Sequence, residues 1–379
     1  MSRRRVLLVL GTRPEVVKLA PVHQALSARP DVFEVKLLVT GQHREMLHQA
    51  LDIFALRPDY DLDVMRDNQD LYSLTANVLT GVQQALDDWR PDLVLVQGDT
   101  TTTFVGSLAA YYARIPVGHV EAGLRTGDKY SPFPEEVNRM LTGCMADLHF
   151  APTDRARDNL RRENVAPEHI HVTGNTSIDA IQWVIANTEP EFDSTLPAPA
   201  CEAIEHPFVL ITTHRRESFG EPMQNTFEAI VELASRYPAY RFVFPVHLNP
   251  NVRDKAQRLL GSVSNVVLLE PLDYIRFSHL MDRCRLILSD SGGVQEEAPS
   301  LNKPVLVLRE TTERQEGIDA GTARLVGTDR QLIVAEASRL IDDEAYYQGM
   351  VSRRNPYGDG RSAERIADIL ERSLQEGLR

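Results

Sequence analysis

Short apolar runs alternate with amphipathic stretches along most of this chain, and this alternation limits the fold more than any other feature. Residues 6–10 and 93–97 are continuous runs rich in Val and Leu, whereas residues 15–28 have the pattern of a helix. Apolar runs of this length, separated by helices, indicate parallel strands that helices cover on both faces. Further strands are expected at 35–40, 116–120 and 148–151, and a helix at 103–114. The pattern predicts an α/β protein.

The alternation weakens between residues 178 and 206 and then begins again. A helix expected at 178–187 is followed by several prolines, which is typical of a domain boundary. Beyond it, a helix is expected at 221–236, and strands at 208–213, 241–246, 266–269, 286–289 and 305–308. We therefore predict two α/β halves of similar size. Their expected bounds are 1–177 and 207–360, with a connecting helix and linker at 178–206 and a terminal helix at 361–379 that packs back on the first half.

The charge and the cysteines narrow the class of protein. Asp and Glu outnumber Lys and Arg by 54 to 41, a net charge of −13 that argues against nucleic-acid binding. Cys144, Cys201 and Cys284 are far apart, which argues against a disulfide framework or a zinc site and favours reduced, cytoplasmic thiols. The apolar run at 6–10 is too short for a signal peptide, and no stretch approaches the ~20 apolar residues of a membrane helix. We expect a cytoplasmic protein without membrane or nucleic-acid partners.

Ligands of open α/β sheets bind beyond the carboxyl ends of the strands, so the expected site is a cleft between the two sheets. Gly11-Thr-Arg-Pro-Glu15 follows the first strand and opens a helix. Its N–H groups, with Arg13 and Lys18, suit a phosphate, although the segment also reads as a tight turn. Asp99 follows the strand at 93–97 and either reaches the site or caps the next helix.

Further carboxylates follow in the first half. Glu121 comes directly after the strand at 116–120, where a buried carboxylate must be paired or used, and Arg125 is one candidate partner. Glu135 and Glu136 are expected in the first turn of a helix, a position that suits negative charge. Arg139 lies four residues after Glu135 and could pair with it.

The second half offers cations and glycines at its strand ends. His214 and Arg215 follow the strand at 208–213, where packing does not explain them. Later strand ends carry groups suited to a phosphate and a ribose, namely Ser291, Gly292, Gly293, Glu296, Arg309 and Arg314. The glycines also read simply as positions of positive φ. Asp59, Asp61 and Asp63 form two DxD patterns, but we place them on a solvated surface between elements and predict no bound metal.

Seven segments in register resemble the bacterial non-hydrolysing UDP-N-acetylglucosamine 2-epimerases. They are Gly11–Glu15, Gly98–Thr103, Gly118–Arg125, Pro134–Arg139, Thr213–Glu217, Ser289–Ala298 and the tail Asn355–Gly360. The resemblance implies two Rossmann-like, doubly wound domains facing across a cleft, the glycosyltransferase-B type. It also implies that UDP-GlcNAc and UDP-ManNAc are interconverted without a cofactor, through UDP and 2-acetamidoglucal, to supply ManNAc for surface polysaccharides. A homodimer is the family expectation.

The resemblance also assigns site residues by position. The catalytic groups it implies are Asp99, Glu121, Glu135 and His214, without deciding which acid serves which face of C2. The implied substrate-binding residues are Arg13, Lys18, Arg139, Phe277, Ser291, Gly292, Gly293, Glu296 and Arg314. The first domain would carry the acids, and the second would bind UDP.

Some family members carry a second, regulatory UDP-GlcNAc site. Gln42, Glu135, Arg215 and His247 match it, but Glu45 stands where Gln is usual and Asn68 where Arg is usual. The lost cation and added anion predict weak or absent activation by substrate.

Three other functions remain open. A glycosyltransferase or a hydrolysing epimerase could use the same fold, and so could a non-catalytic sensor of UDP-sugars. Three acids from separate loops favour elimination and addition.

Overall fold

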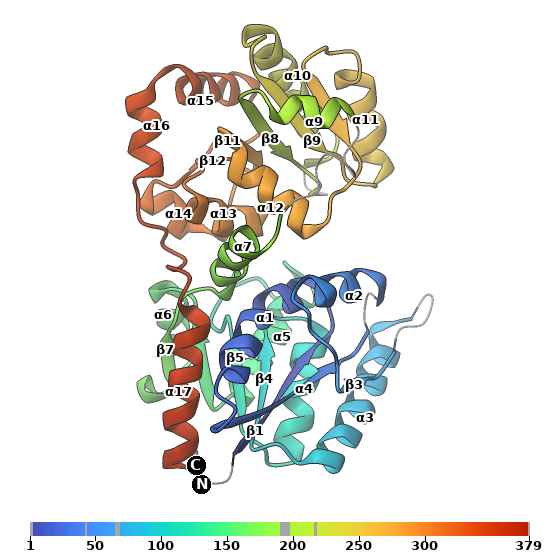
Figure 1. Cartoon of the computed structure of the whole chain (residues 1–379), viewed down its shortest axis with the longest axis vertical. Coiled ribbons are helices and arrows are strands. Elements are labelled where there is room, and N and C mark those ends of the chain that lie inside the picture. The colour runs from blue at the N-terminus through green and yellow to red at the C-terminus, as the bar shows by residue number, and fades with distance from the viewer. Residues whose placement is uncertain (1–2, 42–43, 65–68, 190–197, 216–217, 378–379) are drawn as a thin grey trace. The chain divides into compact units, whose positions relative to one another are not determined.

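The computed structural model describes residues 3–41, 44–64, 69–189, 198–215 and 218–377 (Figure 1). The chain divides into two compact units. The first comprises Met1–Ala180 together with Gly358–Arg379, and the second comprises Ile181–Tyr357. Both are parallel α/β units, which confirms the predicted fold class.

In the described part of the first unit, seven strands form one parallel sheet in the order β3-β2-β1-β4-β5-β6-β7. The first strand of the chain lies inside the sheet and later strands add on both sides, as in a doubly wound Rossmann-like sheet. The strands are β1 (Arg4–Leu10), β2 (Phe33–Val39), β3 (Tyr60–Asp61), β4 (Leu93–Gln97), β5 (Val117–Val120), β6 (Leu148–Ala151) and β7 (Ile170–Val172).

Helices cover both faces of this sheet because its strands are apolar on both sides (Figure 1). Leu7 and Val9 of β1 pack with Val96 in one core together with α3 and α4, while Leu8 and Leu10 point to the other face and are equally buried. The helices are α1 (Arg13–Ser27), α2 (Arg44–Ile53), α3 (Leu71–Trp89), α4 (Thr101–Tyr112), α5 (Glu135–Met145), α6 (Asp154–Arg162) and α17 (Ser362–Glu376), and α7 (Thr176–Asn187) begins in this unit and continues past Ala180 into the second.

In the described part of the second unit, six parallel strands follow the order β10-β9-β8-β11-β12-β13. They are β8 (Phe208–Thr212), β9 (Arg241–Pro245), β10 (Val266–Leu269), β11 (Leu286–Ser289), β12 (Val305–Val307) and β13 (Ala323–Leu325). The helices are α9 (Ala198–Ile204), α10 (Glu221–Arg236), α11 (Pro250–Leu260), α12 (Tyr274–Arg283), α13 (Gly292–Glu297), α14 (Gln315–Ala320), α15 (Arg330–Asp342) and α16 (Glu344–Val351). Each face of the sheet has its own core, and the rings of Phe227 and Phe244 meet edge to face in one of them.

One prediction was wrong in part. Asp59 and Asp61 are exposed, as expected, but Tyr60 and Asp61 form the edge strand β3 beside β2 instead of lying between elements. The Asp59 carboxylate accepts a hydrogen bond from the Leu37 N–H at 2.9 Å, which anchors the segment to the sheet. A strand of two residues is too short to produce a recognisable apolar pattern.

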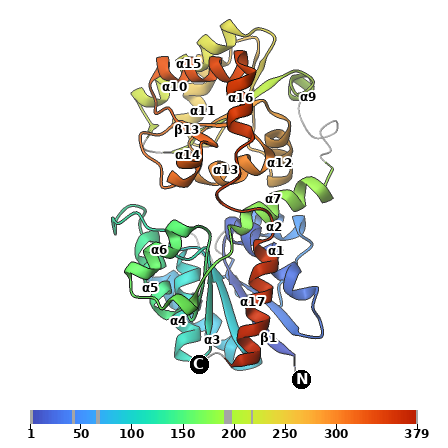
Figure 2. The ribbon, with the colours of Figure 1, turned by 90° about the vertical axis from the view of Figure 1, so that its left-hand side faces the viewer.

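The last helix, α17, belongs to the first unit although it follows the second in the sequence. It lies against α1 (Figure 2). Arg29 at the end of α1 contacts Asp368 at 2.6 Å and Glu371 at 3.0 Å. At its other end, the Ala363 N–H donates to the carboxylate of Asp179 in α7 at 2.8 Å. Helices from distant parts of the sequence are thus fastened together within one unit.

The Asp179 contact predicts a measurable loss of stability. Asp179→Ala leaves the first turn of α17 without this acceptor, and we expect the free energy of unfolding to fall by about 1–2 kcal/mol in urea titrations. The control is Asp154→Ala, which removes an exposed i,i+3 pair with Arg157 and is expected to change little. Equal losses in the two variants would contradict the fastening role.

Two histidines are buried side by side in the first sheet. His119 of β5 and His149 of β6 are paired in register, and each side chain is 1% exposed. Burial lowers the pKa of His119 to about 3 and the pKa of His149 to about 4. Both rings are therefore neutral near pH 7. The ring N–H of His119 donates to the Gly98 carbonyl at 2.8 Å, which supports the loop that carries Asp99.

These lowered pKa values predict how stability depends on pH. Below its usual pKa near 6.5, each histidine is protonated in the unfolded chain but not in the folded one, so stability is lost as the pH falls. Each should cost about 2 kcal/mol of unfolding free energy between pH 7 and pH 5. His119→Gln should reduce this pH dependence by about that amount in urea titrations. An unchanged pH dependence would mean that His119 titrates in the folded protein as it does in the unfolded chain.

Candidate active site

Two carboxylates lie at the carboxyl edge of the first sheet. Asp99 follows β4 and Glu121 follows β5, and these two strands are neighbours. The ends of neighbouring parallel strands meet at one edge, so the two side chains are brought close enough for Glu121 to influence the ionisation of Asp99. A third carboxylate, Glu135, is the first residue of α5. Its Oε2 is buried and has no hydrogen-bond partner within the described residues.

Glu121 is held in an unusual backbone conformation. Its φ is +64°, in the left-handed region that is costly for a residue with a Cβ and is often found at functional sites. The side chain is 7% exposed. Oε1 contacts the ammonium of Lys18 and accepts a hydrogen bond from Asn175 Nδ2 at 3.1 Å, while Oε2 accepts one from Gln97 Nε2. A cation and two neutral donors therefore stabilise the ionised carboxylate.

Asp99 has a different environment. It forms an ion pair with Arg139 of α5, and its backbone carbonyl accepts a hydrogen bond from Asn138 at 3.0 Å. The side chain is 27% exposed. Burial nevertheless raises the pKa of Asp99; Arg139 opposes this effect, and the negative charge of Glu121 adds to it. Asp99 thus holds a proton more readily than an ordinary aspartate.

A fourth carboxylate, Glu15, is buried and links the loop after β1 to the start of α4. Its Oε2 accepts hydrogen bonds from the N–H groups of Gly11 and Thr12 at 2.9 and 2.6 Å. Its Oε1 contacts the hydroxyls of Thr100 and Thr103 at 2.7 and 3.0 Å. Burial raises the pKa of Glu15, and these hydrogen bonds oppose the rise. The start of α1, which carries Lys18, is therefore tied to the start of α4, beside Asp99.

Three contacts suggested by the sequence are not formed: the helix cap by Asp99, the ion pair of Arg139 with Glu135, and the ion pair of Arg125 with Glu121. Asp99 does not cap α4, because Thr100 is the residue next to the first turn and accepts from the Thr103 N–H. Arg139 pairs with Asp99 and Glu136 rather than with Glu135.

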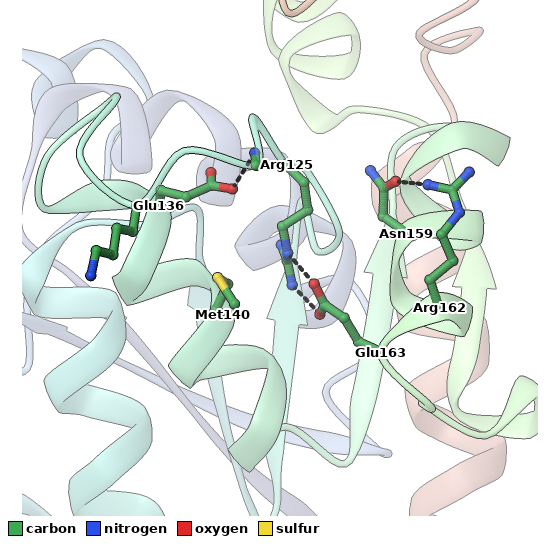
Figure 3. Close-up of a pocket in the computed structure, with 8 residues that line it drawn as sticks. Arg125, Glu136, Met140, Asn159, Arg162 and Glu163 are labelled. Carbon is green, nitrogen blue, oxygen red and sulfur yellow. Dashed lines mark hydrogen bonds and ion pairs between the residues drawn. The ribbon is translucent and has the colours of Figure 1, made fainter.

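Arg125 does not pair with Glu121. Its guanidinium makes two 2.7 Å bonds to the carboxylate of Glu163, a fork geometry that suits arginine (Figure 3). This pair lines a surface pocket of about 400 Å³ beside α5 and α6. Arg162, on the same pocket, donates to Asn159 at 2.8 Å (Figure 3).

In the second unit, Asp290 organises the end of β8. Its side chain is fully buried, and Oδ2 accepts from the Thr213 hydroxyl and from the N–H groups of His214 and Arg215 at 2.8–2.9 Å. Oδ1 lies 3.2 Å from Nδ1 of His214. Burial opposes ionisation of Asp290, but the His214 ring and the backbone N–H groups lower its pKa below the usual value. The His214 ring also stacks on His247 at 5.6 Å.

The other predicted residues of this unit surround the start of α13. Ser291 precedes the helix, and Gly292 lies against Arg314, where a Cβ would come within 3.2 Å of the guanidinium. Arg314 contacts Glu296 and Glu313, each at 2.8 Å. Burial opposes the ionisation of Glu313, but Arg314 and Arg309 lower its pKa to about 2.

The remaining predicted residues are less informative. Arg13 is the first residue of α1 and is partly exposed, and Phe277 of α12 packs against the core of the second unit. Gln42, Asn68 and the Glu45 side chain lie outside what the structure describes.

Within the described residues, no group of three His, Cys, Asp or Glu side chains is placed to hold a metal ion. No helix in the same residues is long and apolar enough to cross a bilayer.

Sequence reasoning missed four residues that shape these sites: Glu15, Gln97, Asn175 and Asp290. Each is either the last residue of a strand or lies within a few residues after a strand. The rule that ligands bind beyond strand ends would have selected all four, but each also reads as an ordinary cap or turn residue.

Comparison with known proteins identifies the family. The model of the UDP-N-acetylglucosamine 2-epimerase family matches residues 24–371. The UDP-N-acetylglucosamine 2-epimerase of Salmonella typhimurium is 55% identical over 374 residues, which cover 97% of this chain and 98% of that protein.

Two solved structures agree with this match. The Neisseria meningitidis UDP-GlcNAc 2-epimerase bound to UDP-GlcNAc is 47% identical, with a TM-score of 0.86 over 97% of this chain and 100% of that one. The S. aureus MnaA–UDP structure is 46% identical, with a TM-score of 0.86 over 99% of this chain and 98% of that one. The resemblance noted in the motifs is confirmed, and the chain belongs to the UDP-N-acetylglucosamine 2-epimerase family of isomerases.

Proposed function

We propose that this protein interconverts UDP-GlcNAc and UDP-ManNAc by eliminating UDP and adding it back, without hydrolysis. The observation that carries the proposal is the contrast between two neighbouring carboxylates: Glu121 contacts a cation and two amide donors, whereas burial raises the pKa of Asp99. Inversion at one carbon needs a group that accepts a proton on one face and a group that donates one on the other. The names of the relatives, and the UDP-GlcNAc bound by the Neisseria enzyme, support the choice of substrate.

Glu121 is the base in the forward direction. Its carboxylate removes the proton from C2, and the electron pair of the C2–H bond forms a C1–C2 double bond. The C1–O bond to the diphosphate breaks at the same time, and UDP leaves with the electron pair of the C1–O bond. The C2 hydrogen is only weakly acidic, so its removal depends on departure of the diphosphate. Lys18 and the amides of Gln97 and Asn175 keep the base ionised.

Asp99 completes the inversion. It delivers a proton to the opposite face of C2 of the 2-acetamidoglucal as the diphosphate oxygen bonds again to C1. The raised pKa of Asp99 suits a proton donor, and the ion pair with Arg139 stabilises the carboxylate that forms when the proton leaves. Oε2 of Glu135, which has no hydrogen-bond partner among the described residues, is available to a sugar hydroxyl or to the acetamido N–H. In the reverse reaction the two carboxyl groups exchange roles.

The second unit holds the nucleotide. The backbone N–H groups that follow Ser291, with the guanidinium of Arg314, suit the diphosphate, and Glu296 suits the ribose hydroxyls. In this proposal Phe277 contacts the uracil, and His214, held by Asp290, interacts with the leaving oxygen. We further propose that each unit acts as a domain, that the protein works in the cytoplasm as a homodimer, and that it supplies ManNAc for surface polysaccharides.

Two rival enzyme types are less well supported. A glycosyltransferase needs an acceptor pocket and one base, and gains nothing from a second carboxylate with a raised pKa beside the first. A hydrolysing epimerase releases UDP and free ManNAc, so its products differ.

The substrate and reaction can be tested together by proton NMR of the protein with UDP-GlcNAc in deuterium oxide, without added metal or nucleotide. We expect UDP-ManNAc to appear and deuterium to enter C2 of both sugar nucleotides, because the proton returned to C2 comes from a carboxyl group that exchanges with solvent. Free ManNAc would identify a hydrolysing enzyme. If the protein binds UDP-GlcNAc but neither converts it nor exchanges its C2 hydrogen, the function that remains is that of a UDP-sugar sensor.

The two carboxylates can be tested by substitution. Glu121→Gln and Asp99→Asn should each lower kcat by at least about 100-fold, the usual size of a general acid or base contribution. Glu163→Gln is the matched control, because Glu163 pairs with Arg125 and contacts neither carboxylate. Near-normal kcat in either carboxylate variant, with the same NMR assay as readout, would remove that residue from the mechanism.

A further inference from the structure

Both the amide oxygen and the amide nitrogen of the Asn175 side chain form hydrogen bonds. Its Oδ1 accepts a hydrogen bond from the Ser177 N–H at 3.0 Å, in the first turn of α7. Its Nδ2 donates to Oε1 of Glu121 at 3.1 Å, across 54 residues of sequence. The residue is 2% exposed, so solvent cannot easily replace either partner. Asparagine suits this position because it carries an acceptor and a donor on one short side chain.

The groups around Glu121 show what this donor adds. Lys18 approaches from α1, Asp99 follows β4 with Arg139 of α5 beside it, and the neutral ring of His119 lies in β5. Among the described residues named here, the charged groups are Glu121, Asp99, Lys18 and Arg139. A second anion near Glu121 favours protonation of its carboxylate, whereas neutral N–H donors favour the ionised form.

We propose that Asn175 is a positioning residue that keeps the Glu121 carboxylate ionised and directed toward the substrate. It acts through Glu121 and has no contact with the reacting atoms in this account. The inference rests on the proposed function only in treating Glu121 as the base. The contact itself also ties the first turn of α7, a helix that continues past Ala180 into the second unit, to the catalytic carboxylate.

The decisive variant is Asn175→Asp. Aspartate caps a helix as well as asparagine does, so the bond to the Ser177 N–H and the start of α7 are retained. The contact with Glu121 changes from an amide donor to a second carboxylate. We expect the acidic limb of the kcat–pH profile to move up by about 1 pH unit or more. At pH 7, kcat should fall while KM for UDP-GlcNAc changes little.

A direct titration makes the test independent of turnover. Protein labelled with ¹³C at the glutamate carboxyl carbons reports ionisation by NMR, and a Glu121→Gln sample assigns the Glu121 signal. The apparent pKa of Glu121 should be higher in Asn175→Asp than in the wild-type protein. Asn175→Ser keeps a capping oxygen but lacks the amide, and should shift the same signal upward by less.

The matched control is Asn159→Ala. Asn159 also donates through its amide to the loop after β5, but its acceptor is the backbone carbonyl of Gly123, at 2.9 Å, and not a carboxylate. We expect this variant to leave both the pH profile and the Glu121 titration unchanged. Equal shifts in the Asn159 and Asn175 variants would indicate a general loosening of the loop and overturn the proposal.

An Asn175→Asp protein with the wild-type pH profile and the wild-type Glu121 titration would also overturn it. If the wild-type protein shows no epimerase activity, the proposed function fails. The NMR titration then still decides whether Asn175 controls the ionisation of Glu121.

Discussion

The first unit depends on one constraint: a carboxylate, Glu121, must remain charged while nearly buried at the end of a strand. Burial of an unpaired charge is costly, and three other elements supply partners for this carboxylate. Lys18 comes from α1, Gln97 from the end of β4 and Asn175 from the start of α7. The left-handed φ of Glu121 is a further cost that the surrounding contacts support. The doubly wound sheet makes this convergence possible, because the relevant strand ends share one edge.

The carboxylates at this edge differ because their partners differ. Glu121 meets a cation and two amides, Asp99 meets one arginine and the field of Glu121, and Glu15 meets backbone N–H groups and hydroxyls. Glu15 needs no catalytic role to be important, since it joins the starts of α1 and α4. Asp290 has a similar structural role in the second unit, because its carboxylate holds the backbone of His214 in place. Buried carboxylates thus serve as structural supports in both units and as the proposed acid and base in the first.

Much of the fold could be predicted from the sequence, because buried parallel strands are continuous apolar runs, as at β1, β4 and β11. The two-residue β3 has no such signal. Asp99 and Glu121 could be selected because they follow strands. Their partners could not, since Lys18 and Glu121 are 103 residues apart and only the packing of α1 brings them together. The ion pair of Arg125 with Glu163 likewise could not be predicted, because it depends on where α6 ends, and no local sequence pattern indicates that.

The central claim is that the C1–O bond breaks while the carboxylates act at C2. Positional isotope exchange tests it directly, with UDP-GlcNAc carrying ¹⁸O at the bridge between C1 and the β-phosphate. If UDP departs and returns, its phosphate can rotate, and the label should move to a non-bridging oxygen at a rate comparable to epimerisation; Glu121→Gln should abolish this movement. Epimerised product with all its label still in the bridge would show that C2 is inverted without loss of UDP, and would contradict the account.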